Sequence, residues 1–108
     1  MVYLEIEWHN QEIQKKMSDI QRLKKIIGIE LTKMVKLRFN QIEATEDFQE
    51  FIKYGFGKVH PLKGNLKKYF GISITGNYRL VIMPDKNNKI IVRGVMDYHG
   101  DKYNWLIP

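Results

Sequence analysis

The chain has 108 residues, a formal net charge of +6 and no cysteine. This length suits one domain, so we expect a single domain over residues 1–108. The lack of cysteine excludes disulfides and thiolate metal sites, and no apolar run is long enough to span a membrane. Glu5 and Glu7 lie where a secretory signal would be basic and then apolar, so we expect a cytoplasmic protein.

The first half of the chain predicts one strand and two main helices. Apolar and polar side chains alternate from Val2 to Trp8, which indicates a strand with one buried face. Asn10 is a typical helix N-cap, and apolar residues then recur every three or four positions until Gly28, which we expect to end the helix. The apolar side of the second helix is expected to comprise Leu31, Met34, Val35 and Ile42, aided by Leu37 or Phe39.

The second half changes from helix to strand. A short helical piece is expected to end at Gly55, and the glycine-rich segment 55–65 predicts a loop. The apolar period then becomes two, which predicts strands at 70–75, at 78–83 after a Gly-Asn turn, and at 89–98. The short tail could dock on the body through its Trp105, Leu106 and Ile107 side chains.

This order of elements predicts an α+β fold. We expect an N-terminal strand and two helices packed on one face of a curved, mostly antiparallel sheet, which a C-terminal three-strand meander completes. The opposite face of the sheet would then be free to serve as a concave working surface.

The positive charge is concentrated in one third of the chain. Residues 51–84 contain six basic side chains and no acidic one, whereas the remaining segments are nearly balanced. Such a block suits a polyanion, most simply a nucleic acid. A lysine-rich solvated loop that only aids solubility explains the charge about as well.

Three short motifs contain residues that can do chemistry, namely HPLK, GNYRL and MDYHG. Simple strand alternation places Asp97 and His99 on one face of the last strand together with Arg93, and Met96 and Tyr98 on the other face. The candidate residues in these motifs are His60, Lys63, Arg79, Asp97, Tyr98 and His99.

This set of residues suits metal-independent cleavage of RNA. The chain has no HExxH motif, no carboxylate cluster and no phosphate-binding glycine loop. RNA supplies its own nucleophile, the 2′-hydroxyl, so a protein needs only a base, an acid and cations for the transition state. Taken one by one, however, a histidine is more often a surface or core residue, and Tyr98, Asp97 and Arg79 also have ordinary structural explanations.

The motifs HPLKG, GNYRL and DYH, within residues 60–83 and 97–99, resemble those of the HigB toxins, the plasmid-maintenance killer proteins of the RelE/ParE superfamily. The resemblance implies a small α+β toxin that cuts mRNA in the ribosomal A site without a cofactor or metal. It also implies the 70S ribosome, mRNA and a HigA-like helix-turn-helix antitoxin as partners, with a toxin–antitoxin heterotetramer as a possible complex and no membrane partner.

The resemblance also implies roles for individual residues. His99 would transfer a proton, with Asp97 orienting it or sharing the base role, and His60 would be the other proton-transfer group or a phosphate contact. Lys63 and Arg79 would stabilise charge in the transition state, and Tyr98 would line the site and stack on a base. The residues expected to contact RNA outside the catalytic set are Lys58, Lys67, Lys68 and Arg93.

Two alternatives remain open from the sequence. The chain could be a ParE-like inhibitor of DNA gyrase that acts by binding a protein, or a non-catalytic relic whose site has decayed. The presence of both histidines together with Lys63 and Asp97 favours the nuclease, because gyrase binding does not need that set. The sequence leaves open which residue is the acid, which is the base, and what the tail 100–108 does.

Overall fold

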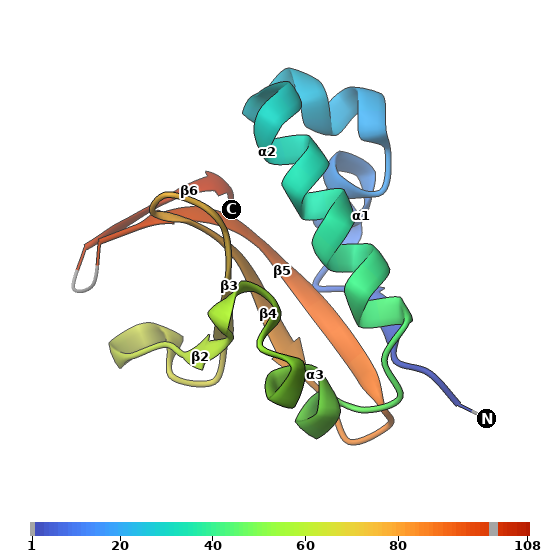
Figure 1. Cartoon of the computed structure of the whole chain (residues 1–108). Coiled ribbons are helices and arrows are strands. Elements are labelled where there is room, and N and C mark those ends of the chain that lie inside the picture. The colour runs from blue at the N-terminus through green and yellow to red at the C-terminus, as the bar shows by residue number, and fades with distance from the viewer. Residues whose placement is uncertain (1, 100–101) are drawn as a thin grey trace.

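The computed structural model describes residues 2–99 and 102–108, and Figure 1 shows helices on one side of a strongly curved sheet. The helices are α1 (Gln11–Met17), α2 (Ile20–Glu43) and α3 (Phe48–Tyr54). The strands are β1 (Glu5–Trp8), β2 (His60–Pro61), β3 (Phe70–Thr75), β4 (Tyr78–Pro84), β5 (Lys89–Tyr98) and β6 (Tyr103–Ile107). The expected α+β class is therefore confirmed.

The helical region has more breaks than the sequence predicted. Asn10 caps α1 as expected, because its Oδ1 accepts a hydrogen bond from the Ile13 N–H at 2.9 Å. However, α1 already ends at Met17, and Asp19 caps α2 by accepting from the Gln21 N–H at 3.0 Å. Gly28 has a φ of 88° and interrupts α2 instead of ending a helix, so the chain turns sharply within α2 (Figure 1).

The segment between α3 and β3 is more ordered than the predicted loop. Gly55 ends α3 with a φ of 74°, as expected. Two single 3-10 turns, at Phe56–Lys58 and Gly64–Leu66, then flank the two-residue strand β2. β2 pairs antiparallel with β3 through His60 opposite Gly71, so the HPLK motif lies at a sheet edge.

The sheet has the strand order β1-β5-β4-β3-β2, and β6 also pairs with β5. β1 is parallel to β5, and all other pairs are antiparallel, which confirms the meander of β3, β4 and β5. β1 pairs with residues 89–92 of β5, whereas β6 pairs with residues 95–98. The tail thus forms a sixth strand, where the sequence had suggested only a docked segment.

A β-bulge changes the faces of β5. Val81 of β4 pairs with Gly94, but the next residue, Ile82, pairs with Val92, so Arg93 is the extra residue. Arg93 therefore lies on the same face as Met96, and its guanidinium lies 4.4 Å from the ring centre of Trp105. The predicted alternation, which grouped Arg93 with Asp97 and His99, is wrong because it assumed a strand without a bulge.

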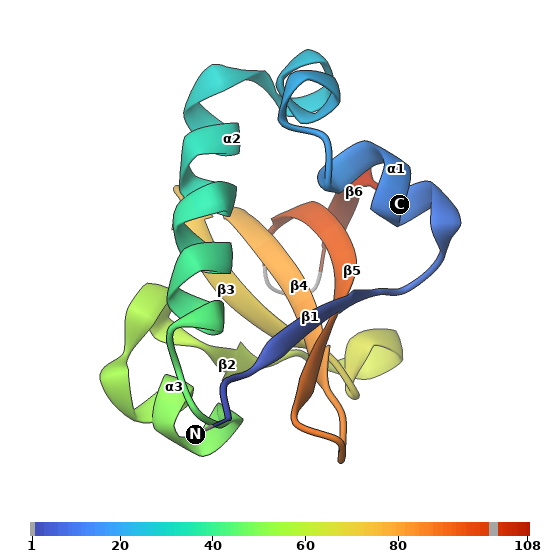
Figure 2. The same cartoon turned by 90° about the vertical axis from the view of Figure 1, so that its right-hand side faces the viewer.

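The two faces of the sheet carry cores of different size. The main core includes Val35 of α2, Phe51 of α3 and Leu80 of β4. Figure 2 shows the helices over the face of the sheet on which this core lies. Of the apolar residues expected for the second helix, Leu31, Val35 and Ile42 are buried, Met34 and Phe39 are partly buried, and Leu37 is 41% exposed. The other face carries a smaller cluster of Leu62, Leu66, Tyr69, Val81 and Met96. The segment 62–69 therefore covers part of the face that we had expected to be free.

Candidate active site

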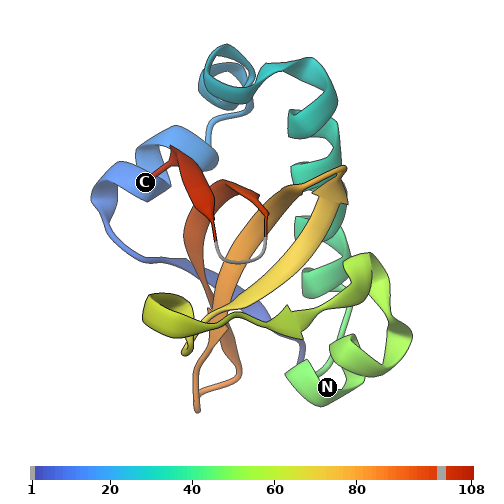
Figure 3. The same cartoon turned by 90° about the vertical axis from the view of Figure 1, so that its left-hand side faces the viewer.

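His60 and Tyr98 are neighbours, and Tyr98 packs against the smaller cluster on the face of the sheet opposite the helices. Figure 3 views this face. The ring centres of His60 and Tyr98 are 6.4 Å apart. Nδ1 of His60 is 3.1 Å from the carbonyl oxygen of Lys58, and a carbonyl can only accept, so Nδ1 carries the proton of this hydrogen bond. In the neutral ring this leaves Nε2 with the lone pair, free to accept a proton from a substrate.

Arg79 lies on the same face, between the strands that carry His60 and Tyr98. It pairs with Ser73 of β3 on one side and with Met96 of β5 on the other. Its Nη1 donates to the carbonyl oxygens of Gly76 at 2.9 Å and Tyr78 at 3.0 Å, while its Nε is shielded from solvent and has no hydrogen-bond partner among the described residues. No carboxylate of the described chain forms an ion pair with Arg79, so its charge is available to an anion.

Asp97 and His99 form a pair of their own at the end of β5. Oδ1 of Asp97 is 3.0 Å from Nε2 of His99, and the His99 side chain is 50% exposed. Asp97 pairs in register with Tyr78, which packs against the main core, so Asp97 leaves the strand on the side opposite Tyr98. The backbone N–H of His99 donates to the Lys102 carbonyl at 2.8 Å, which ties the residue to the start of β6.

The structure thus arranges the predicted catalytic residues in two adjoining groups. His60, Arg79 and Tyr98 share the open face, and the Asp97–His99 pair adjoins Tyr98 along the chain. The lysines expected to act with them, Lys58, Lys63, Lys67 and Lys68, are all exposed in the segment that leads through β2 toward β3. That segment contains no acidic residue.

The sequence reading missed His9, Tyr103 and Trp105. His9 follows β1, and its backbone N–H donates to the Val92 carbonyl at 3.0 Å, next to Arg93. Partial burial, and then the positive charges of Arg93 and Lys68, lower the pKa of His9. The sequence offered a weak signal for Tyr103 and Trp105, since aromatic residues two positions apart would share one face of a strand.

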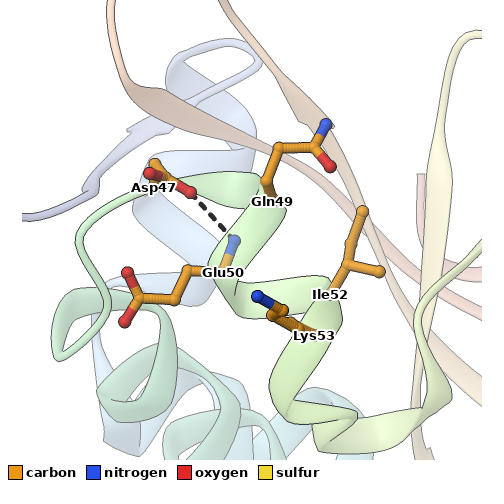
Figure 4. A pocket seen from close by; sticks show the side chains of 5 residues that line it. All are labelled: Asp47, Gln49, Glu50, Ile52 and Lys53. Atoms are coloured by element: carbon orange, nitrogen blue, oxygen red, sulfur yellow. Dashed lines mark hydrogen bonds between the residues drawn. The ribbon is translucent and has the colours of Figure 1, made fainter.

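A hollow on the surface of α3 is not part of this site. It has a volume of about 590 Å³ and is lined by Asp47, Gln49, Glu50, Ile52 and Lys53 (Figure 4). Its two carboxylates and single lysine do not suit a polyanion. In the described part of the chain, no three histidine or carboxylate side chains are grouped as a metal site requires, and no helix is long and apolar enough to cross a membrane.

No family model and no curated protein sequence matches the chain. Among solved structures, a YoeB–YefM complex from Staphylococcus aureus matches at 24% identity and a TM-score of 0.58, over 91% of this chain and 99% of its own. A YoeB/ParE toxin from Agrobacterium tumefaciens matches at 18% identity and a TM-score of 0.59, over 89% of this chain and 100% of its own. The chain has the fold of these toxins.

The YoeB/ParE-like fold accounts for nearly the whole chain, because both matches extend over about nine tenths of it. A YoeB dimer from Staphylococcus aureus aligns equally well, with a TM-score of 0.57. At these identities the likeness concerns the fold alone. The resemblance to HigB in particular, which rests on the HPLKG, GNYRL and DYH motifs, stays a prediction.

Proposed function

We propose that this chain is the toxin of a type II toxin–antitoxin system, of HigB type, and that it is a ribosome-dependent mRNA endonuclease that needs no metal. The observation that carries this proposal is the contact of His60 with Tyr98 on a basic face where Arg79 has no carboxylate partner. The fold of the YoeB and YoeB/ParE toxins supports it.

The proposed reaction is an internal transfer within RNA. The 2′-oxygen attacks the adjacent phosphorus, a base removes the 2′-hydroxyl proton, and the bond from phosphorus to the 5′-oxygen breaks as an acid protonates that oxygen. The products are a 2′,3′-cyclic phosphate and a free 5′-hydroxyl. A histidine suits either proton step because its ordinary pKa lies near neutrality.

We assign each candidate residue a role by its chemistry. His60 offers a free Nε2 for one proton transfer or a phosphate contact, and His99, oriented by Asp97 at 3.0 Å, performs the other. Arg79 and Lys63 stabilise the additional negative charge on the non-bridging oxygens of the phosphate, and Tyr98 stacks on a base beside the scissile bond. The exposed Lys58, Lys67 and Lys68, together with Arg93, hold the RNA backbone.

The proposed partners follow from the same assignment. Two of the matched structures are YoeB–YefM complexes from Staphylococcus aureus, and one of them is a heterotetrameric toxin–antitoxin complex. We therefore propose that a HigA-like helix-turn-helix antitoxin silences this chain in a heterotetramer, and that the 70S ribosome presents the mRNA. The toxin would act in the cytoplasm.

The second candidate function is that of a ParE-like gyrase inhibitor, because one matched structure is a YoeB/ParE toxin. Expression in a bacterial host separates the two candidates. Lys25→Ala, at an exposed position of α2, is the control. This variant and wild type should stop the incorporation of labelled amino acids before they stop the incorporation of thymidine. His99→Ala and His60→Ala should permit growth. Growth arrest by His99→Ala, with early loss of gyrase supercoiling, would instead favour the gyrase inhibitor.

A further inference from the structure

His9 lies beside Arg93. Arg93 is located in the short stretch of β5 between the part that pairs with β1 and the part that pairs with β6. β1 ends with Trp8 opposite Val92, and the His9 N–H continues this pairing to the Val92 carbonyl at 3.0 Å. β6 begins to pair only at Val95, so the bulge residue Arg93 falls between the two partner strands. The exposed Lys68 lies in the segment that covers the open face, with its Nζ 5.6 Å from the ring centre of Tyr69. Partial burial, and then the positive charges of Arg93 and Lys68, lower the pKa of His9.

Arg93 is held in place but its charge is not neutralised. Its guanidinium lies over the Trp105 ring at 4.4 Å, an arrangement that orients the cation without satisfying its N–H groups. Its Nη1 is shielded from solvent and has no hydrogen-bond partner among the described residues, none of whose carboxylates forms an ion pair with Arg93. His9 thus adjoins Arg93 through the pairing of β1 with β5, and Lys68 lies over the ring of Tyr69, which belongs to the smaller cluster on the same face. Among the described residues no carboxylate forms an ion pair with any of the three, which favours an anionic ligand.

A row of aromatic side chains joins this cluster to the proposed active site. The Trp105 and Tyr103 rings meet edge to face, with centres 6.1 Å apart. Tyr103 is the cross-strand partner of Tyr98, whose ring is 6.4 Å from that of His60. Tyr98, Tyr103 and Trp105 all pack against the smaller cluster on the open face, so the row runs from β6 across to β5. Figure 3 views this face, with the backbone of β6 in red.

We propose that His9, Lys68 and Arg93 form a phosphate-binding site for single-stranded RNA, connected to the active site by the row Trp105, Tyr103 and Tyr98. The inference deepens the proposed function and rests on RNA as the substrate. Tyr98 is five positions after Arg93, about 16 Å along the strand at ~3.3 Å per residue, so the site binds a phosphate away from the scissile one. Cations beside stacked aromatic rings favour a nucleic acid over an acidic protein segment, because bases stack and carboxylates do not.

Binding of an uncleavable RNA tests this site directly. The probe is a labelled 12-nucleotide single strand with every 2′-hydroxyl methylated, followed by fluorescence anisotropy between about 50 and 200 mM salt. Arg93→Gln and Lys68→Gln should each weaken binding about 5- to 10-fold and reduce the slope of log affinity against log salt by about 0.7. Lys33→Gln, an equal loss of charge at an exposed position of α2, should bind as wild type does.

Protonation of His9 provides a second and independent readout. The charged groups that act on His9 are Arg93 from β5 and Lys68 from the segment over the open face. A bound phosphate should offset their repulsion and raise the pKa of His9, followed as the shift of its ring resonances by NMR with and without the probe. Affinity should therefore increase more steeply in wild type than in His9→Gln as pH falls from about 8 to 6.

The outcomes separate this inference from the proposed function. Equal binding by Arg93→Gln, Lys68→Gln and Lys33→Gln would overturn the phosphate site even if wild type cleaves mRNA on ribosomes. Weakened binding by the first two variants, with no cleavage by wild type, would support the site and contradict the nuclease. Competition by polyglutamate at lower concentration than unlabelled probe would overturn RNA in favour of an acidic protein segment. Lys68 is exposed, so Lys68→Gln keeps the test valid if Arg93→Gln fails to fold.

Discussion

Replacing Gly94 with alanine tests the junction between β5 and β6, on which the aromatic row depends. Gly94 follows the bulge residue Arg93 and has a φ of 156°, a conformation that residues with a side chain rarely adopt. A Cβ at this position would collide with the carbonyl oxygen of Ile107 and lie 3.3 Å from the Trp105 ring. The clash involves backbone, so the end of β6 has to move away.

Two energetic contributions determine how much folding stability Gly94→Ala should lose. The strained backbone conformation costs about 1–3 kcal/mol. Ile107 is fully buried, and lifting it from the core costs about 1.5–3 kcal/mol more. Gly94→Ala should therefore reduce the free energy of unfolding by about 2.5–6 kcal/mol, a large part of the total stability of a domain of this size.

Gly76→Ala is the matched control for this substitution. Gly76 has a φ of 52°, but a Cβ there meets no atom within 4 Å, so it adds backbone strain of about 1–2 kcal/mol without a clash. Urea unfolding followed by circular dichroism compares both variants with wild type. If the two variants lose the same stability to within about 0.5 kcal/mol, the close approach of β6 to Gly94 is refuted.

Three further predictions concern the core, the first helix and pH. Leu80→Ala removes a fully buried side chain of the main core and should cost about 3–5 kcal/mol in urea unfolding; a loss below about 1 kcal/mol would contradict the packing. Asn10→Ala removes the cap of α1 and should cost about 1 kcal/mol, whereas a substitution with no effect would mean that the cap bond at Ile13 does not form in solution. Because the pKa of His9 is lowered in the folded protein, the unfolded chain binds that proton more readily, so stability should fall as pH drops below about 6.5. Urea midpoints at pH 7.5 and 5.5 should show a smaller fall for His9→Gln, and an equal fall would contradict the environment assigned to His9.

Local signals in the sequence predicted much of the fold correctly. Asn10 identified the start of α1, Gly55 identified the end of α3, and the change of apolar period at Phe70 located the meander. These features depend on capping, backbone freedom and side-chain alternation, each of which acts over a few residues. The break at Asp19 was missed because its side chain caps α2 within a stretch whose apolar spacing is continuous.

The features that sequence reasoning missed depend on contacts between distant segments. The bulge at Arg93 follows from the pairing of β4 with β5, although an isolated glycine within a strand pattern, Gly94, was a usable signal. His9 reaches Arg93 only because β1 pairs in parallel with β5, some eighty residues later in the chain. The candidate residues of the three motifs were chosen because residue type alone restricts the chemistry, and their roles stay predictions. The aromatic row could be described only once the position of β6 was known.

Cleavage of mRNA on programmed ribosomes tests the proposed function most directly. Wild type, His99→Ala and Lys25→Ala would each be added to stalled 70S complexes in the presence of a metal chelator that leaves the ribosomes intact, and the 5′ ends of the fragments mapped. We expect wild type and Lys25→Ala to cut within the A-site codon and leave 5′-hydroxyl ends, and His99→Ala to cut at least about 100-fold more slowly. Absence of cuts by wild type, or equal cutting by His99→Ala, would contradict the assignment of this site as an mRNA endonuclease.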